Sequence, residues 1–159
     1  MKTLFLSSIR ATIVLFLLSA PEAAAQAPLV LEWKTDLKFG TIASDIAGGG
    51  TVVVPTTSDT RSITGLLTDF GGTVKRGKFK ITGEPRAWVV ITMPSTIVIQ
   101  KGTSSNTMTI DNLTLDANPV KLNKNGIKTV FFGGTLNVGT NQKKGNYKND
   151  ALVINVEYL

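Results

Sequence analysis

The side chains that could perform acid–base chemistry in this sequence are a few carboxylates. Glu32 precedes Asp36 by four positions, and Asp111 precedes Asp116 by five. Paired carboxylates can hydrolyse glycosides, and clustered Asp and Asn oxygens, here including Asn118, can bind Ca²⁺. Neither spacing forms a recognisable motif, and Asp and Asn are also typical turn residues. We therefore expect these acids to shape turns and strand edges, with neither a catalytic residue nor a metal site among them.

The composition excludes several other chemistries, because the chain contains no histidine and no cysteine. Ser-His-Asp triads, histidine-bound metals and thiol nucleophiles are therefore excluded. Carboxylate pairs and lysine-assisted serine nucleophiles remain. The glycine run at 48–50 precedes a strand-like segment, whereas a phosphate cradle needs a helix there. We expect a non-enzymatic protein without a cofactor.

A basic cluster is formed by Lys75, Arg76, Lys78 and Lys80, in a chain of net charge +6. On a strand, Lys78 and Lys80 would share one face and Phe79 would lie on the other. This pattern is typical of a solvated strand face. The alternative is a contact site for an anionic polysaccharide or another polyanion of the cell envelope. We expect no nucleic-acid partner inside the cell.

The first residues have the pattern of a bacterial export signal. Lys2 and Arg10 flank a positively charged start, an apolar block covers 11–20, and Ala23 and Ala25 fit the rule for signal-peptidase cleavage. The apolar block is shorter than the roughly 20 residues that span a bilayer. The sequence thus predicts a protein that is secreted, periplasmic or at the cell surface, with no stable membrane insertion after cleavage.

The predicted division is a signal peptide at 1–25 and one domain at 26–159. Apolar residues in the domain alternate with polar ones in short runs separated by Gly, Pro, Asn and Ser, which favours strands. We expect Trp33 and Trp88 to lie in the core, and the glycine pair at 133–134 to mark a bulge or bend. The fold class predicted is all-β, a single immunoglobulin-like antiparallel β-sandwich. The predicted strands cover residues 29–33, 37–39, 52–54, 79–81, 88–93, 97–99, 108–115, 130–138 and 152–158.

Several segments, in their order and spacing, resemble the bacterial domain-of-unknown-function family 4402. The segments are 36–42 (DLKFGTI), 79–84 (FKITGE), 108–112 (MTIDN) and 132–139 (FGGTLNVG). The closing segments 145–147 (GNY) and 153–158 (VINVEY) are also similar to the last strand of spore-coat-U-like and archaic chaperone-usher pilins. The family resemblance implies a small secreted β-sandwich of uncharacterised function, with no catalytic residues to transfer.

The pilin similarity implies a specific assembly strand. Subunits that exchange strands carry an alternating N-terminal extension that completes a neighbour, and Leu29, Leu31 and Trp33 could form it. However, these residues run almost directly into 36–42, which resembles the domain's own first strand, so a self-complete sandwich is equally compatible. The cysteine pair often found in spore-coat-U-like subunits is missing.

Two functional classes stay open. One is a structural or adhesive surface protein, such as a pilus-like subunit that associates with itself or with other envelope proteins. The other is a free periplasmic or secreted module that binds an anionic envelope component or polysaccharide.

Overall fold

The computed structural model describes residues 25–159, and within this range every regular element is a β-strand. The predicted signal peptide lies outside the described residues, except for Ala25. No helix in the described range has the length and apolar character needed to cross a membrane. The prediction of an all-β fold is therefore confirmed. The strands are β1 (Val30–Thr35), β2 (Lys38–Phe39), β3 (Ile42–Ser44), β4 (Gly50–Val54), β5 (Ser62–Gly65), β6 (Leu67–Asp69), β7 (Val74–Lys75), β8 (Gly77–Thr82), β9 (Trp88–Thr92), β10 (Ile97–Lys101), β11 (Thr107–Leu115), β12 (Val120–Lys121), β13 (Ile127–Val138), β14 (Tyr147–Lys148) and β15 (Asn155–Tyr158).

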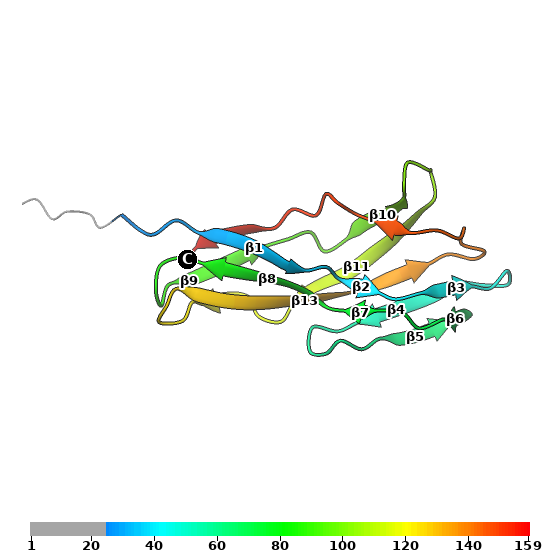
Figure 1. The fold of residues 1–159 in the computed structure, drawn as a ribbon, viewed down its shortest axis with the longest axis horizontal. Helices are drawn as coiled ribbons and strands as arrows, with labels where there is room; N and C mark the ends of the chain where they lie inside the picture. The colour runs from blue at the N-terminus through cyan, green and yellow to red at the C-terminus, as the bar shows by residue number, and fades with distance from the viewer. Residues whose placement is uncertain (1–24) are drawn as a thin grey trace, which may run out of the picture.

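The strands form two main antiparallel sheets (Figure 1). The larger sheet has the order β1-β8-β13-β11-β10-β14, and β4 pairs with both β13 and β5. The smaller sheet has the order β12-β9-β15. The long strand β13 organises the larger sheet: β8 and then β4 follow one of its edges, while β11 follows the other. Two short ribbons, β2–β7 and β3–β6, complete the fold.

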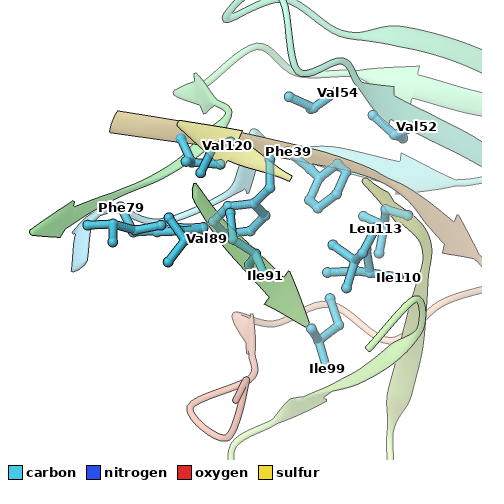
Figure 2. Close-up of a cluster of buried hydrophobic side chains, with 14 of the residues drawn as sticks. Phe39, Val52, Val54, Phe79, Val89, Ile91, Ile99, Ile110, Leu113 and Val120 are labelled. Carbon is cyan, nitrogen blue, oxygen red and sulfur yellow. The ribbon is translucent and has the colours of Figure 1, made fainter. Parts of the chain in front are cut away.

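One hydrophobic core joins the two main sheets (Figure 2). In β8, burial alternates along the strand, so that Phe79 and Ile81 are fully buried while Lys78 and Lys80 lie on the opposite face. Val89 and Ile91 of β9 enter the same core from the smaller sheet. Burial of such side chains contributes on the order of 1.5–3 kcal/mol each. The alternation that predicted the strands is thus the alternation that builds a sandwich.

The irregularity expected at Gly133 and Gly134 lies on the neighbouring strand. β13 is continuous through both glycines, and the register shift falls in β11 between Asp111 and Thr114, where Asn112 has a φ of +50°. The glycines serve close packing instead. A Cβ at Gly133 would lie 2.3 Å from the Val54 carbonyl oxygen, so only glycine lets the chains approach this closely.

The two tryptophans differ from the prediction that both lie in the core. Trp33 packs against buried Phe79 and Phe132 but stays 41% exposed. Trp88 is 47% exposed, and for it the prediction is wrong. The reason is the register of β9, in which Val89 and Ile91 take the inward positions, so Trp88 must point to the other face.

Candidate functional site

The candidate site is the strip between the first and last strands of the described chain. β1 ends the larger sheet and pairs only with β8, while β15 ends the smaller sheet and pairs only with β9, among residues 25–159. The two strands lie on the same side of the sandwich, where the red C-terminal strand runs beside blue β1 (Figure 1). We call this strip, made of residues 29–33 and 154–158, the terminal seam.

On β15, the unpaired edge carries free backbone groups. The Leu159 N–H donates to the Trp88 carbonyl at 3.0 Å. In an antiparallel pair, the backbone groups of successive residues point alternately toward and away from the partner strand. Leu159 therefore directs its backbone groups toward β9, and the residues one and three positions before it, Tyr158 and Val156, direct theirs the other way. In this register Tyr158 lies opposite Val89 and Val156 opposite Ile91, and the N–H and C=O groups of both residues point away from β9, toward the seam.

The same alternation fixes the free edge of β1. The Gly83 N–H donates at 2.9 Å to the carbonyl of Gly126, the residue directly before β13. Lys80, an odd number of positions from Gly83, therefore directs its backbone groups the other way, toward β1. Its partner there is Glu32. Leu31 and Trp33, one position to either side of Glu32, consequently direct their N–H and C=O groups away from β8. Both strands thus present unpaired backbone groups to the seam.

Apolar side chains under the seam are covered incompletely. Leu31, Ile154, Val156 and Tyr158 pack against the core but are only partly buried. By contrast, the inward residues of the central strands β8 and β13 are almost fully buried. Free edges over partly exposed apolar rows are the arrangement that accepts a further strand.

The seam is closed at one end by a hydrogen-bonded latch. The Tyr158 hydroxyl donates to the Ala27 carbonyl at 2.5 Å and accepts from the Glu84 N–H at 2.6 Å. The Ala27 N–H in turn donates to the Glu84 carboxylate at 3.3 Å. Gly83 makes room for this contact, since a Cβ there would lie 2.5 Å from the Tyr158 oxygen. The Tyr158 latch therefore joins the last strand and the segment before β1 to the turn after β8.

An aromatic cluster lies toward the other end of the seam. The Trp33 ring centroid is 5.5 Å from that of Phe132 and 6.5 Å from that of Phe79. The Trp33 Nε1–H donates to the Asp36 carboxylate at 2.9 Å, which fixes the indole ring. Trp33 is the half-exposed edge of this cluster. Of the predicted assembly residues, Leu31 and Trp33 lie in the chain's own strand β1, and Leu29 directly precedes it.

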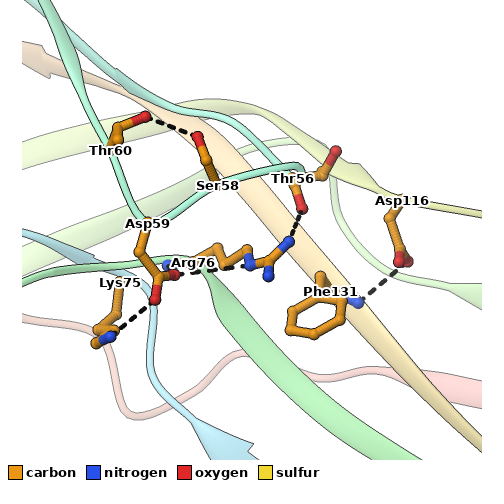
Figure 3. A network of polar contacts seen from close by, with 8 residues as sticks. All are labelled: Thr56, Ser58, Asp59, Thr60, Lys75, Arg76, Asp116 and Phe131. Carbon is orange, nitrogen blue, oxygen red and sulfur yellow. Dashed lines mark hydrogen bonds and ion pairs between the residues drawn. The ribbon is translucent and has the colours of Figure 1, made fainter.

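The predicted polyanion residues are mostly engaged in ion pairs (Figure 3). The Lys75 ammonium lies 2.7 Å from the Asp59 carboxylate, and the Arg76 guanidinium lies 3.6 Å from the same group. Arg76 also stacks over the Phe131 ring at 3.8 Å. Hydrogen bonds from the Lys75 side chain and then the Arg76 backbone N–H lower the pKa of Asp59. Both cations thus share one carboxylate, which compensates half of their charge.

The other two lysines of the cluster face outward from β8. Lys80 lies 2.6 Å from the Glu32 carboxylate, while Lys78 makes no ion pair within residues 25–159. The hydrogen bond from Lys34, followed by that from Lys80, lowers the pKa of Glu32 to about 2. The structure thus brings the four basic residues near one another but leaves only Lys78 without a carboxylate partner in the described range.

The acidic and amide residues considered for a Ca²⁺ site have structural contacts. Asp116 accepts the Phe131 N–H at 3.0 Å (Figure 3), and Asp111 accepts from the Asn137 amide at 2.7 Å. The Asn118 amide bonds to both the N–H and the carbonyl of Ile91, at 2.9 and 2.8 Å, and so takes the place of a strand at that edge of β9. No group of three acidic side chains that could hold a metal ion occurs within the described range.

Two of these contacts had no signal in the sequence. Asn118 reaches Ile91 across 27 positions, and Tyr158 reaches Ala27 across 131. The alternation at 152–158 placed Tyr158 on an inward face, but nothing local indicates the partner of its hydroxyl. Contacts between residues so far apart in sequence depend on how the sheets pack.

Fold and site together define a class: an all-β sandwich whose open surface is a pair of strand edges. The family model described as a domain of unknown function (DUF4402) matches residues 29–158. The chain belongs to this family, as its motifs predicted. No curated protein and no solved structure matches the chain, so the similarity to pilins has no support from a relative.

Proposed function

We propose that this chain is an exported, non-enzymatic structural or adhesive protein of the bacterial surface that assembles by strand pairing at the terminal seam. A pilus-like subunit is the form of this proposal that the pilin similarity suggests. The observation that carries it is the set of free N–H and C=O groups on Val156 and Tyr158, above apolar side chains that are only partly covered.

Physical chemistry favours a strand as the occupant. An extended peptide that pairs with a sheet edge gains main-chain hydrogen bonds, while its alternate side chains fill the space beneath. At β15 such a strand would extend the smaller sheet to a fourth strand, opposite β1. Inward side chains of the added strand would then complete the cover over Leu31 and Val156.

The proposal differs from donation of the N-terminal segment. Leu31 and Trp33 already pair with Ile81 and Phe79 of the same chain. Donation of β1 to a neighbour would remove Trp33 from the aromatic cluster and expose the edge of β8. The geometry therefore supports a seam that receives a strand, with β1 remaining in place.

The binding-module alternative is supported less well. Lys75 and Arg76 share Asp59, and Lys80 shares Glu32 with Lys34, so the predicted polyanion face stays positively charged but most of its cations already have a carboxylate partner. Exposed ion pairs of this kind are weak but still compete with an external anion.

The test compares Val156→Pro with Val156→Ala in the chain 26–159. Both substitutions shorten the side chain, but only proline removes the N–H that faces the seam, and edge positions tolerate proline when that N–H is not used within the sheet. We expect concentration-dependent oligomers, measured by size-exclusion chromatography with light scattering, for the parent and Val156→Ala, and monomers for Val156→Pro.

Hydrogen exchange keeps the proposal testable if Val156→Pro fails to fold. In the parent chain, the amides of Val156 and Tyr158 should exchange more slowly as the protein concentration rises, because assembly pairs them. A parent chain that stays monomeric at all concentrations, with unchanged exchange at these two amides, would contradict self-assembly.

A further inference from the structure

A second surface lies at the opposite end of the molecule from the Tyr158 latch. The β3–β6 ribbon stands at the far end of the long axis from the C-terminus (Figure 1). The Phe70 N–H donates to the Thr41 carbonyl at 3.0 Å, which continues the β3–β6 pairing beyond the end of β6. Because side chains alternate along a strand, Leu66, Thr68 and Phe70 follow one another along the outer face of this ribbon, while Leu67 faces the core. The outer face carries large apolar groups that nothing in the described chain covers.

Three apolar side chains protrude from the ribbon and its loop, with Ile46 and Leu66 at the far end and Phe70 at the inner end, opposite Thr41. Ile46 is 82% exposed, Leu66 54% and Phe70 66%. The Asp45 N–H donates to the Leu66 carbonyl at 3.0 Å, which holds the loop of Ile46 beside Leu66. We call Ile46, Leu66 and Phe70 the tip patch. Grouped exposed apolar residues mark a contact surface, whereas single ones do not.

Lysines lie next to the tip patch. The Asn141 N–H donates to the Asp45 carbonyl at 3.0 Å, and the Gln142 N–H donates to the Ser44 hydroxyl at 2.8 Å. These bonds fix the loop that continues into Lys143 and Lys144, both of which are exposed. Neither lysine takes part in an ion pair among residues 25–159.

The acidic groups near the tip are already engaged. Asp45 accepts the Ala47 N–H at 2.8 Å. Asp69 forms an ion pair with Arg61 and accepts the Gly71 N–H at 2.6 Å. Asp45 keeps its negative charge, because a hydrogen bond does not neutralise a carboxylate, so Lys143 and Lys144 together leave this end with a small excess of positive charge.

We propose that the tip patch inserts into an anionic lipid surface, with Lys143 and Lys144 against the headgroups. Protruding apolar side chains beside lysines are the combination that binds the interface of an anionic bilayer. A bilayer deforms around a convex surface and needs no hollow in the protein. Two hollows on this chain are lined by other residues, around Leu113 and around Val98. The proposal goes beyond assembly at the seam and rests on different residues.

The experiment is flotation of the chain 26–159 with vesicles of phosphatidylcholine alone or mixed equally with phosphatidylglycerol. We expect binding to the mixed vesicles and little to the neutral ones.

The double variant Ile46→Ser, Phe70→Ser should lose about tenfold or more of the partition coefficient. Lys143→Gln and Lys144→Gln should each lose about fivefold at low salt. Val98→Ser, which alters an apolar residue 52% exposed elsewhere, is the matched control and should bind as the parent does.

Two results would overturn the proposal. One is absence of parent binding to mixed vesicles. The other is equal binding by the parent and the Ile46→Ser, Phe70→Ser variant, which would indicate adsorption to any polyanion; soluble dextran sulfate should then compete fully. Thermal unfolding verifies that each variant is folded. Oligomer size is measured on the same samples, so failure of lipid binding and failure of seam assembly are seen separately.

Discussion

The Tyr158 hydroxyl accepts the Glu84 backbone N–H at 2.6 Å, although 74 positions separate the two residues. The same hydroxyl donates to Ala27, so one side-chain oxygen ties the last strand to the turn after β8 and to the start of β1. This contact closes the end of the terminal seam at which the free backbone groups of Val156 and Tyr158 lie.

Tyr158→Phe should destabilise the fold locally and loosen β1. The substitution keeps the ring but leaves the Glu84 N–H and the Ala27 carbonyl without their partner, at a cost of about 1–3 kcal/mol. Urea unfolding measures the loss, and hydrogen exchange should accelerate at Val30 and Glu32, whose amides bond to β8. Unchanged exchange at these amides would show that the latch does not hold β1.

Gly77→Ala should be strongly unfavourable, because a Cβ at Gly77 would lie 2.0 Å from the buried Phe132 ring. Phe132 can move only by disturbing Trp33 and Phe79, so we expect a loss of about 1–3 kcal/mol in urea unfolding and a shift in tryptophan emission. Gly139→Ala is the control, since its nearest neighbour is the Gln142 side-chain oxygen at 3.2 Å. Equal stability of the two variants would refute this account of the core.

Glu32 should make the free energy of unfolding depend on pH at acidic pH. Hydrogen bonds from Lys34 and then Lys80 lower its pKa from 4.5 to about 2 in the folded chain. A carboxyl whose pKa is lower in the folded chain than in the unfolded chain stabilises the fold at pH values above the unfolded pKa. That contribution is lost as the pH falls from about 4.5 through about 2. Urea midpoints of Glu32→Gln should therefore fall less across this window than those of the parent.

Glu157→Gln is the matched control for this experiment, because Glu157 makes no ion pair in the described range. Its midpoints should follow those of the parent chain across the same pH window. A parent-like acid dependence in Glu32→Gln would contradict the assignment.

Most of the main strands could be predicted from local pattern. Runs such as 79–81 and 130–138 alternate because one face of a sheet is buried, and that burial is visible in the sequence. The ribbons β2–β7 and β3–β6 and the short β12 were not predicted as pairs. Strands of two or three residues carry too little alternation, and their existence depends on neighbours brought close by the larger sheet.

The candidate site was predicted in part. The sequence predicts Leu29, Leu31 and Trp33 as a strand that could have an assembly role, and the structure places Leu31 and Trp33 in the chain's own β1, with Leu29 directly before it. The partners of the basic cluster were not foreseen, since Asp59 lies in another loop, 16 positions before Lys75. Ion pairs across such separations follow from chain reversal, which local sequence does not encode.

The sequence by itself determined the all-β class, the inward faces of the main strands and the family, because hydrophobic alternation and short motifs are properties of neighbouring residues. Only the tertiary structure decided that β1 and β15 end different sheets on one side of the sandwich and that Tyr158 joins them. It also decided which of their backbone groups are free. The direction of a backbone N–H is fixed by pairing register with a distant strand, and no residue carries that information alone.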